Sequence, residues 1–252
     1  MLTALTRKVS STIAECQLTF MERQSIDYQK ACKQHQQYET VLQNLGLELV
    51  TLCQQPQLPD AVFVEDGAVV VDEVAVIAIP ARASRRGEIH TLAAALEQFK
   101  SIEFLTGSAS LEGGDVIQDG MTLYVGLSTR TNLEGATQLS GILSPHGYEV
   151  KTVKVSGCLH LSTAVSCLNP GVFLLNPLWV DTGAFSGCEI VNVPAAEPWA
   201  ANVLVLDHMI VIPEACLETA ALLRQRGFTV TTIDISEFQK AEAGLTCMSL
   251  IF

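Results

Sequence analysis

The chain has 252 residues, 48% of them hydrophobic and 17% charged, so it can bury a large core. Its formal net charge of -12 would repel polyanions, which argues against nucleic acid and anionic membranes as partners. The N-terminal residues contain no readable secretory signal, and no apolar stretch reaches the length of a membrane span. These features predict a soluble, cytoplasmic protein that forms one compact domain, or tightly fused repeats, over residues 1–252.

The N-terminal part of the chain contains short apolar strands, turns and helical stretches in a repeating order. A first, partial unit has a strand at 4–6, a helix at 28–45 and a strand at 47–52. The second unit consists, in chain order, of strands at 61–64, 68–71 and 74–79, a helix at 87–99 and a strand at 102–105, with a turn at 65–67.

Three further units repeat this order. The third has strands at 115–117 and 122–126 around a turn at 119–120, then a helix at 133–143 and a strand at 148–155. The fourth runs from residue 159 through strands at 172–175 and 189–193. The fifth has strands at 202–206 and 209–212, a helix at 217–226 and a strand at 229–235, and the C-terminal segment 245–252 could complete the first unit.

Five ββαβ units predict a ring. Joining the two chain ends would close an α/β propeller with strands around a central cavity and helices outside, and closure removes exposed sheet edges. The alternative is an open, doubly wound α/β sheet. That alternative lacks a Gly-rich phosphate loop after a strand, since residues 112–115 (Glu-Gly-Gly-Asp) fit neither the dinucleotide fingerprint nor the P-loop.

Eight cysteines occur, and none lies in a C-x-x-C pair. In a chain of this length they predict buried free thiols, of which one or two at most are reactive. Cys247 is the strongest candidate for a reactive, nucleophilic thiol, because it lies among small residues near the chain end, where a tight turn could present it to a cavity. The histidines and cysteines show no regular ligand spacing, so no metal site is predicted.

His160 is the candidate general acid or base. It lies in a strand-like stretch, where its ring would point away from the face of Leu159 and Leu161. Taken alone, such a histidine is more often a satisfied core or surface residue.

Acidic turns and two arginines complete the candidate set. The acidic turns lie at 63–66 and 111–115, each at a strand junction facing the mouth of a ring, and their carboxylates would otherwise be solvated. Arg85 and Arg130 each follow a strand and could bind a carboxylate through two hydrogen bonds, or could be surface charges.

Five strings of residues occur in a characteristic order. They are Phe-Val-Glu-Asp at 63–66, Leu-Glu-Gly-Gly-Asp at 111–115, Gly-Leu-Ser-Thr-Arg-Thr-Asn at 126–132, His-Leu-Ser at 160–162 and Gly-Leu-Thr-Cys-Met-Ser-Leu at 244–250. This set resembles the motifs of the dimethylarginine dimethylaminohydrolases, which belong to the guanidine-modifying (pentein) superfamily. The resemblance implies the five-bladed α/β propeller of that superfamily.

The resemblance also implies the reaction. Cys247 would attack the guanidinium carbon of an Nω-methylated arginine to form a covalent thiouronium, and His160 would act as general acid and then base. The products would be citrulline and dimethylamine or methylamine, with no cofactor. The partner would be a small cationic amino acid, and a homodimer is permitted.

Further roles follow from the same resemblance. Asp66 and Glu112 would hydrogen-bond the guanidinium, and Glu112 would also orient His160. Arg85 and Arg130 would grip the substrate carboxylate. The remaining pocket residues would be Asp60, Phe63 and Glu65, and residues 4–10 would supply the opening strand and part of a lid.

Two other activities stay open at this stage. An arginine deiminase would use the same nucleophile on unmethylated arginine, but such enzymes usually carry an acidic residue two positions after the histidine, where this chain has Ser162. A non-catalytic binder of cationic amino acids would keep the pocket without turnover, and the presence of both Cys247 and His160 speaks against it.

Overall fold

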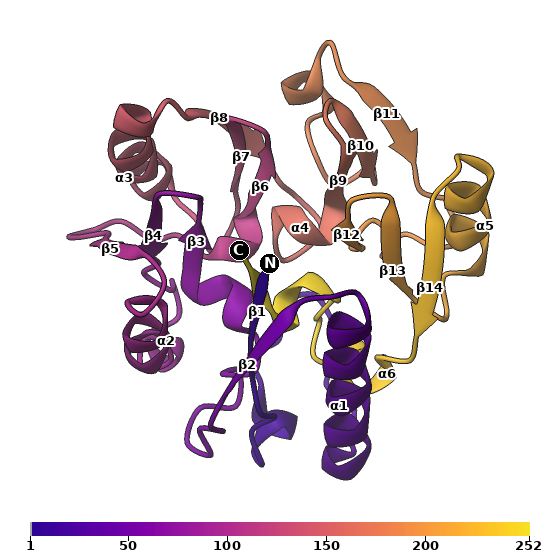
Figure 1. The fold of residues 1–252 in the computed structure, drawn as a ribbon, viewed down its shortest axis with the longest axis horizontal. Coiled ribbons are helices and arrows are strands. Elements are labelled where there is room, and N and C mark those ends of the chain that lie inside the picture. Colours follow the sequence, from indigo (N-terminus) through magenta and orange to yellow (C-terminus); the bar gives the residue numbers. More distant parts are fainter. Residues whose placement is uncertain (1) are drawn as a thin grey trace.

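Five three-stranded sheets surround a common axis in this computed structural model, which describes residues 2–252 (Figure 1). In each sheet the central strand pairs antiparallel with one neighbour and parallel with the other. The sheets are, in strand order, β15 (Leu250–Ile251), β1 (Thr3–Arg7) and β2 (Glu48–Leu52); β3 (Ala68–Val70), β4 (Val74–Ile77) and β5 (Ser101–Phe104); β6 (Val116–Asp119), β7 (Thr122–Leu127) and β8 (Glu149–Lys154); β9 (Val165–Asn169), β10 (Val172–Leu175) and β11 (Glu189–Asn192); β12 (Leu204–Leu206), β13 (Met209–Pro213) and β14 (Thr229–Ile233).

The longer helices lie on the outside of the ring (Figure 1). In chain order, each comes between the central strand of a sheet and the strand parallel to it. They are α1 (Tyr28–Asn44), α2 (Ile89–Leu96), α3 (Leu133–Leu143) and α5 (Leu217–Gln225). Short helical turns are α4 (Leu161–Ala164), α6 (Ser236–Gln239), η1 (Ile13–Glu15), η2 (Val64–Gly67), η3 (Ala83–Arg85), η4 (Gly113–Asp115), η5 (Ser144–His146), η6 (Thr182–Phe185) and η7 (Thr246–Met248).

Side-chain caps fix where two of the outer helices begin. The Asp27 carboxylate accepts the Lys30 backbone N–H at 3.0 Å ahead of α1, and the Asn132 side chain accepts the Gly135 N–H at 2.8 Å ahead of α3. Each bond satisfies an N–H that has no partner inside its own helix. The predicted bounds of α3 are confirmed, because the Asn cap and the apolar period agree.

The helices fill the wedges between neighbouring sheets. Leu139 and Leu143 of α3 belong to one buried cluster with Leu123 of β7 and with Val76 of β4 in the adjacent sheet. Full burial of each such side chain contributes roughly 1.5–3 kcal/mol. The ring is therefore held by apolar contacts between sheets as well as by hydrogen bonds within them.

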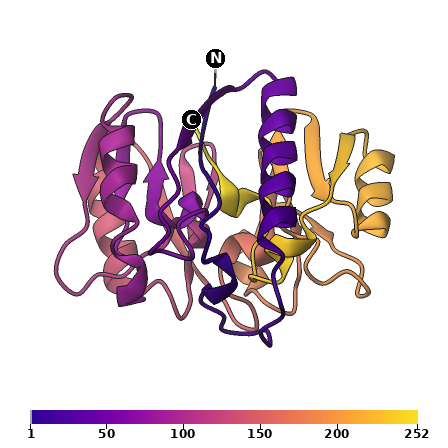
Figure 2. The ribbon, with the colours of Figure 1, turned by 90° about the horizontal axis from the view of Figure 1, so that it is seen from below.

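The first sheet closes the ring with both ends of the chain. Ala4 pairs with Ile251 and Leu5 with Leu250, and the Thr3 N–H donates to the Phe252 carbonyl at 2.7 Å. The predicted completion of the first unit by the C-terminal segment is confirmed, and so is the five-bladed α/β propeller. Figure 2 shows both termini at one end of the ring axis, while the segment after β1 crosses the opposite end.

Two expectations about the repeating units are wrong. Residues 61–64 form a turn that leads into η2, because Phe63 N–H bonds the Asp60 carbonyl at 2.9 Å and Val64 N–H bonds the Val62 carbonyl at 3.0 Å. These local bonds leave the backbone groups of the segment unavailable to a sheet. The fourth unit also lacks a full outer helix, and has only η6 between β10 and β11.

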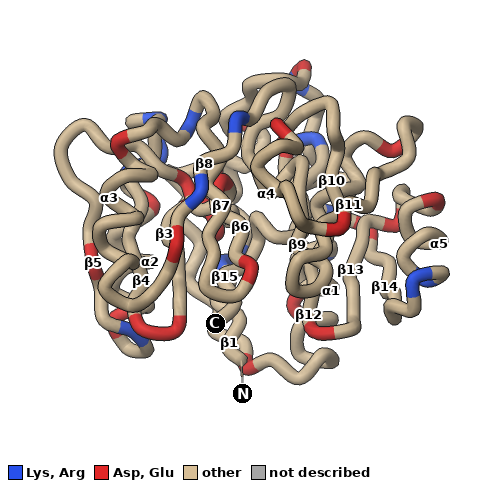
Figure 3. Tube along the Cα trace, turned by 90° about the horizontal axis from the view of Figure 1, so that it is seen from above, with Lys and Arg blue, Asp and Glu red and all other residues tan. Residues whose placement is uncertain are grey.

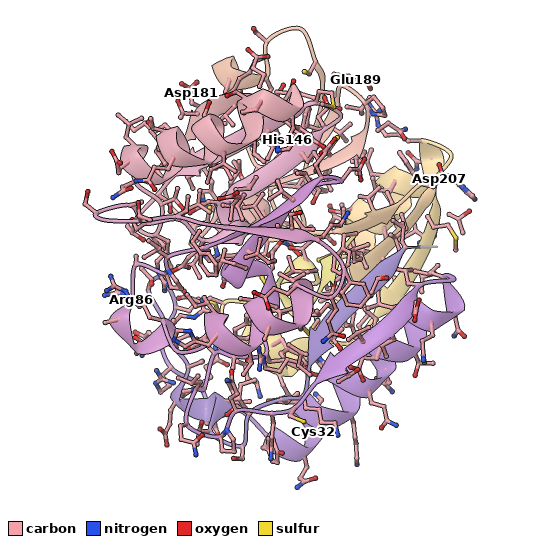
Figure 4. All side chains as sticks on the ribbon, turned by 60° about the vertical axis from the view of Figure 1, so that its left-hand side comes forward. Cys32, Arg86, His146, Asp181, Glu189 and Asp207 are labelled. Atoms are coloured by element: carbon pink, nitrogen blue, oxygen red, sulfur yellow. The ribbon has the colours of Figure 1, made fainter. Side chains whose placement is uncertain are left out.

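The exposed charges are dispersed over loops and outer elements (Figure 3). Arg86, His146, Asp181, Glu189 and Asp207 lie at the periphery (Figure 4). Among residues 2–252, no helix is both long and apolar enough to cross a bilayer. A second set of charged residues is buried near the axis, where burial is costly unless the charges are paired.

Candidate active site

Cys247 reaches the axis because its turn, η7, directly precedes the strand that closes the ring. Its side chain is buried, and the Gly244 N–H donates to its Sγ at 3.4 Å. Burial, followed by the carboxylates of Glu65 and Asp66, holds the pKa of the Cys247 thiol well above its ordinary value. The sulfur is therefore protonated at neutral pH.

His160 lies at the N-cap of α4 with an extended backbone, and the expectation that it belongs to a strand is wrong. The Leu161 N–H binds the Asp115 carboxylate at 2.9 Å instead of a neighbouring strand. The imidazole is 2% exposed, with its Nε2 2.8 Å from Glu112 Oε2 and its Nδ1 3.6 Å from Asp66 Oδ1.

The two carboxylates control the charge of this imidazole. Burial lowers the pKa of His160, but Asp66 and Glu112 more than offset it and raise the pKa to about 9. Burial alone would raise the pKa of Glu112, yet His160 and the two arginines hold it below its ordinary value. At neutral pH the pair is an imidazolium and a carboxylate, so His160 carries a proton that it can donate.

Glu112 is fully buried and joins the histidine to Arg130. Arg130 Nη1 donates to both Glu112 oxygens, at 3.2 and 3.1 Å, and Arg130 Nη2 reaches Thr19 Oγ1 at 3.4 Å. The Arg130 Nε has no hydrogen-bond partner among residues 2–252. Arg130 therefore has donor capacity left for a ligand.

Arg85 is more fully paired. Its Nη1 lies 2.6 Å from Asp66 Oδ2, and its Nη2 and Nε donate to the Glu88 carboxylate at 2.8 to 3.2 Å. Arg86, the next residue, is exposed at the molecular surface (Figure 4). The η3 turn thus separates two identical residues into a buried, paired cation and a solvated one.

Gly114 allows the catalytic candidates to approach one another. A Cβ at this position would lie 2.8 Å from Asp66 Oδ1 and 2.9 Å from His160 Nδ1, closer than real Cβ atoms approach. Any other residue would push the carboxylate or the imidazole away. The Gly-Gly pair at 113–114 is thus a packing requirement of the site.

Glu65 occupies a different place from its neighbour Asp66. It is partly exposed, lines a larger cavity at the end of the axis near the chain termini, and accepts a hydrogen bond from Ser162 at 3.5 Å. Burial of its carboxyl and the neighbouring Asp66 raise the pKa of Glu65 to about 7. Its carboxyl also lies beside the Thr246 and Cys247 side chains of the η7 turn.

A small cavity joins most of the predicted site residues. The side chains around it nearly fill it, and its free volume is about 10 Å³. The predicted residues around it are Asp60, Phe63, Asp66, Arg85, Arg130, His160 and Cys247. Glu112 sits behind His160 and Arg130 as their shared partner.

Residues 17–21, which we call the cover segment, close this cavity. The Asp60 carboxylate accepts the Gln17 N–H at 3.0 and 3.2 Å, and the Glu242 carboxylate accepts the backbone N–H groups of Thr19, Phe20 and Met21. The expectation that residues 4–10 form part of the lid is wrong, since β1 and Ser10 are held against residues 48–55.

Several residues around the cavity were missed by the motif analysis. Glu88 follows Arg85 by three residues, a spacing that suits a pair on one helical turn. Glu242 has a φ of +58°, unusual for a residue other than glycine, and no sequence pattern indicates it. Asp115 was visible in the acidic motif, but its bonds to Ser128 and to the turn after His160 depend on the fold.

The convergence of acids also defines what the cavity can hold. Ligand atoms of Asp66, Glu112 and His160 lie within 4.8 Å of one another, a set that could hold a metal ion. However, Arg85 and Arg130 place positive charge against the same carboxylates. Asp66 Oδ1 is buried without a hydrogen-bond partner among residues 2–252, so it is an open acceptor for an N–H donor.

Comparisons with known proteins identify the family of the chain. A family model described as N,N dimethylarginine dimethylhydrolase, eukaryotic, matches residues 4–171. A dimethylarginine dimethylaminohydrolase of Streptomyces coelicolor is 34% identical over 98% of this chain and 95% of its own. The Pseudomonas aeruginosa protein of that name is 32% identical over 90% of each chain.

Solved structures give the same result. The Pseudomonas aeruginosa enzyme, as a cysteine-to-serine variant complexed with citrulline, matches with a TM-score of 0.95 and 30% identity over the whole of both chains. The N-terminal domain of a cyanobacterial arginine dihydrolase matches with a TM-score of 0.89 at 18% identity, and so shares the fold alone. The chain therefore belongs to the dimethylarginine dimethylaminohydrolase family.

Proposed function

We propose that this protein hydrolyses Nω-methylated arginine, either asymmetric dimethylarginine or monomethylarginine, to citrulline and dimethylamine or methylamine. The observation that carries the proposal is the open Asp66 Oδ1 acceptor beside His160, in the cavity that also exposes Cys247. A guanidinium supplies N–H donors for such an acceptor and a carbon for the sulfur.

Substrate binding would activate the nucleophile. The buried thiol is held in its protonated form by burial and by the carboxylates of Glu65 and Asp66. A guanidinium bound to Asp66 places a positive charge beside the sulfur, which favours the thiolate, and the thiol proton leaves to solvent. The nucleophile would then form only when its target is in place.

The first chemical step would transfer the carbon to the enzyme. The Cys247 thiolate adds to the guanidinium carbon, and the His160 imidazolium donates its proton to the methylated nitrogen as the C–N bond breaks. The amine departs, a covalent thiouronium remains on the sulfur, and the imidazole is neutral. The raised pKa of His160, about 9, keeps it protonated for this donation at neutral pH.

The second step would release citrulline. Neutral His160 removes a proton from water, and the resulting hydroxide adds to the thiouronium carbon. The C–S bond then breaks, the hydroxyl proton returns to the sulfur, and the ureido product leaves. Glu112, 2.8 Å from His160 Nε2, would stabilise the imidazolium that forms again.

The amino-acid end of the substrate would meet the arginines. Arg130 supports this role best, because its Nε has no partner among the residues described and its Nη2 has only the long contact with Thr19. Arg85 is engaged by Asp66 and Glu88, so it would contribute positive potential or exchange one of these contacts. Asp60 and Phe63 would complete the pocket wall.

The test is citrulline formation from asymmetric dimethylarginine, monomethylarginine and arginine in parallel. We expect turnover of the methylated substrates above that of arginine. Turnover of arginine alone would reassign the protein as a deiminase. No citrulline from any of the three would contradict the proposal.

A further inference from the structure

Asn202 is a buried amide between the two segments that carry the nucleophile and the histidine. It lies just before β12 and is 4% exposed. Its Nδ2 donates to the Ser162 carbonyl at 2.8 Å and to Thr246 Oγ1 at 2.9 Å, and its Oδ1 accepts the Thr246 N–H at 3.2 Å. These bonds use both of its N–H donors and its carbonyl.

The bonded residues are the sequence neighbours of the reacting groups. Thr246 directly precedes Cys247, and Ser162 lies two residues after His160. One planar side chain therefore connects the η7 turn to the start of α4. These two elements precede strands of different sheets, β15 and β9.

The chain makes room for this amide. A Cβ on Gly244 would lie 2.2 Å from Asn202 Oδ1, so only glycine lets the Cys247 turn approach so closely. On its other side the same turn is followed by Ser249, whose hydroxyl is 2.7 Å from the Tyr38 hydroxyl in α1. The turn is thus held on both sides, and its Asn202 side connects it to the histidine segment.

We propose that Asn202 is a positioning residue that fixes Cys247 relative to His160, an inference that rests on the proposed function. The sulfur attacks the guanidinium carbon, and the imidazole protonates the nitrogen that leaves this carbon. Cys247 and His160 must therefore both be correctly placed relative to the same substrate carbon. A displacement of about 1 Å in such a geometry can cost about 100-fold in rate. Substrate affinity depends on other groups, namely Asp66 and the arginines.

The variants are chosen to separate positioning from stability. Asn202→Asp keeps an acceptor for the Thr246 N–H but loses both Nδ2 donors, and Asn202→Ala loses all three bonds. Asn176→Ala is the matched control, because Asn176 is also buried, donates to the Pro198 carbonyl at 3.1 Å and accepts the Leu178 N–H at 3.0 Å, outside the cavity.

Steady-state kinetics on asymmetric dimethylarginine provide the main readout. We expect both Asn202 variants to lose kcat by about 10- to 100-fold with KM within about threefold of wild type. Asn176→Ala should unfold at a lower temperature, as Asn202→Ala should, yet keep its kcat. An unchanged kcat in the Asn202 variants, an equal loss in Asn176→Ala, or a change confined to KM would each overturn the proposal.

A second readout does not depend on the substrate. Iodoacetamide alkylation of Cys247, followed by peptide mass spectrometry, reports how firmly the turn holds the buried thiol. We expect alkylation at least about fivefold faster in both Asn202 variants than in wild type or Asn176→Ala. An unchanged alkylation rate would overturn the positioning role. If the variants were alkylated faster but the wild type formed no citrulline, only the proposed function would be contradicted.

Discussion

The two ends of the ring axis differ in size and in chemistry. The end beneath the cover segment has a free volume of about 10 Å³ and is lined by carboxylates, two arginines, His160 and Cys247. The end near the chain termini has a free volume of about 430 Å³ between mostly apolar strand residues, and the acids that line it are Glu65 and Asp207. The smaller cavity carries the groups that can make and break bonds, so converging charge identifies the site better than volume does.

The difference follows from the structural elements at each end. Turns and loops supply the side chains of the small cavity, among them Asp66 of η2, Arg85 of η3 and Cys247 of η7, whereas the first strands of several sheets line most of the large one. Strand residues pack in fixed alternation, while tight turns can aim several polar groups at one point. The predictions below test whether the chemistry is confined to the charged end.

The largest expected effect is loss of the nucleophile. Cys247→Ser should lower kcat on asymmetric dimethylarginine by at least about 10⁴-fold, because a hydroxyl is far less readily ionised than a thiol. Cys216→Ser, which changes another buried cysteine at the start of α5, should keep wild-type kcat. Equal activity of Cys247→Ser and wild type would remove the cysteine from the mechanism.

Loss of the histidine should be the next largest effect. His160→Asn should lower kcat by about 10²- to 10⁴-fold, the usual contribution of a general acid or base. Rapid-quench kinetics should show that formation of the covalent adduct is slowed, since the amine then leaves without a proton donor. A variant that forms the adduct at the wild-type rate would contradict the assignment of His160 to the first step.

The pH dependence reports on the same pair. Below pH 9 His160 stays protonated, so kcat/KM should rise with pH as the thiolate fraction grows, and the rise should level off near pH 9, where His160 loses its proton. Glu112→Gln removes a charge that raises the pKa of His160, so the break should move to lower pH and kcat should fall by about 10- to 100-fold. A break that stays in place would show that Glu112 does not set the charge of the imidazole.

A smaller effect is expected at the cover segment. Glu242→Gln weakens the carboxylate contacts with the backbone of residues 19–21 and should raise KM by about 5- to 30-fold, with a smaller change in kcat. Glu237→Gln is the control. Glu237 is also a buried carboxylate that accepts a backbone N–H, that of Asp27 at 2.8 Å, but it does not line the cavity. If both variants raise KM equally, the cover segment has no special role in binding.

The smallest effect should come from the large cavity. Gln118→Ala and Val205→Thr alter its wall, and we expect kcat/KM to stay within about twofold of wild type in both. Circular dichroism and thermal unfolding would verify that each variant is folded. A loss of tenfold or more in a folded variant would show that the large cavity takes part in the reaction.

The ring was predictable because its signals are local and repeated. Alternating apolar strands bounded by turns gave the order of the sheets, and the apolar period of 133–143 gave the bounds of α3. The segment 61–64 failed, because an apolar run of four residues does not distinguish a strand from a buried turn. Only the backbone bonds to Asp60 and Val62 decide between them.

The chemistry of the site was predictable only in part. The motifs contained Cys247, His160, Asp66 and Arg130, and the family resemblance added Arg85. The fold brings all five around one cavity. Motifs could not indicate that Arg85 is largely paired while Arg130 keeps open donors, because the partners come from distant segments.

The cover segment and the Asn202 amide were equally invisible in the sequence. Each depends on contacts between residues 40 to 223 positions apart, between Asn202 and Ser162 at one extreme and Thr19 and Glu242 at the other. Polar residues of these types are ordinarily solvated, so their sequence context alone gives no reason to place them in the site.

The most direct test of the account is to trap the covalent intermediate. Wild-type protein would be mixed with asymmetric dimethylarginine, quenched in acid within the first turnover and analysed by intact-mass and peptide mass spectrometry. The account predicts an adduct on Cys247 whose mass is that of the substrate less the departed dimethylamine, absent from Cys247→Ser. Citrulline formation with no adduct, or an adduct on another cysteine, would contradict it.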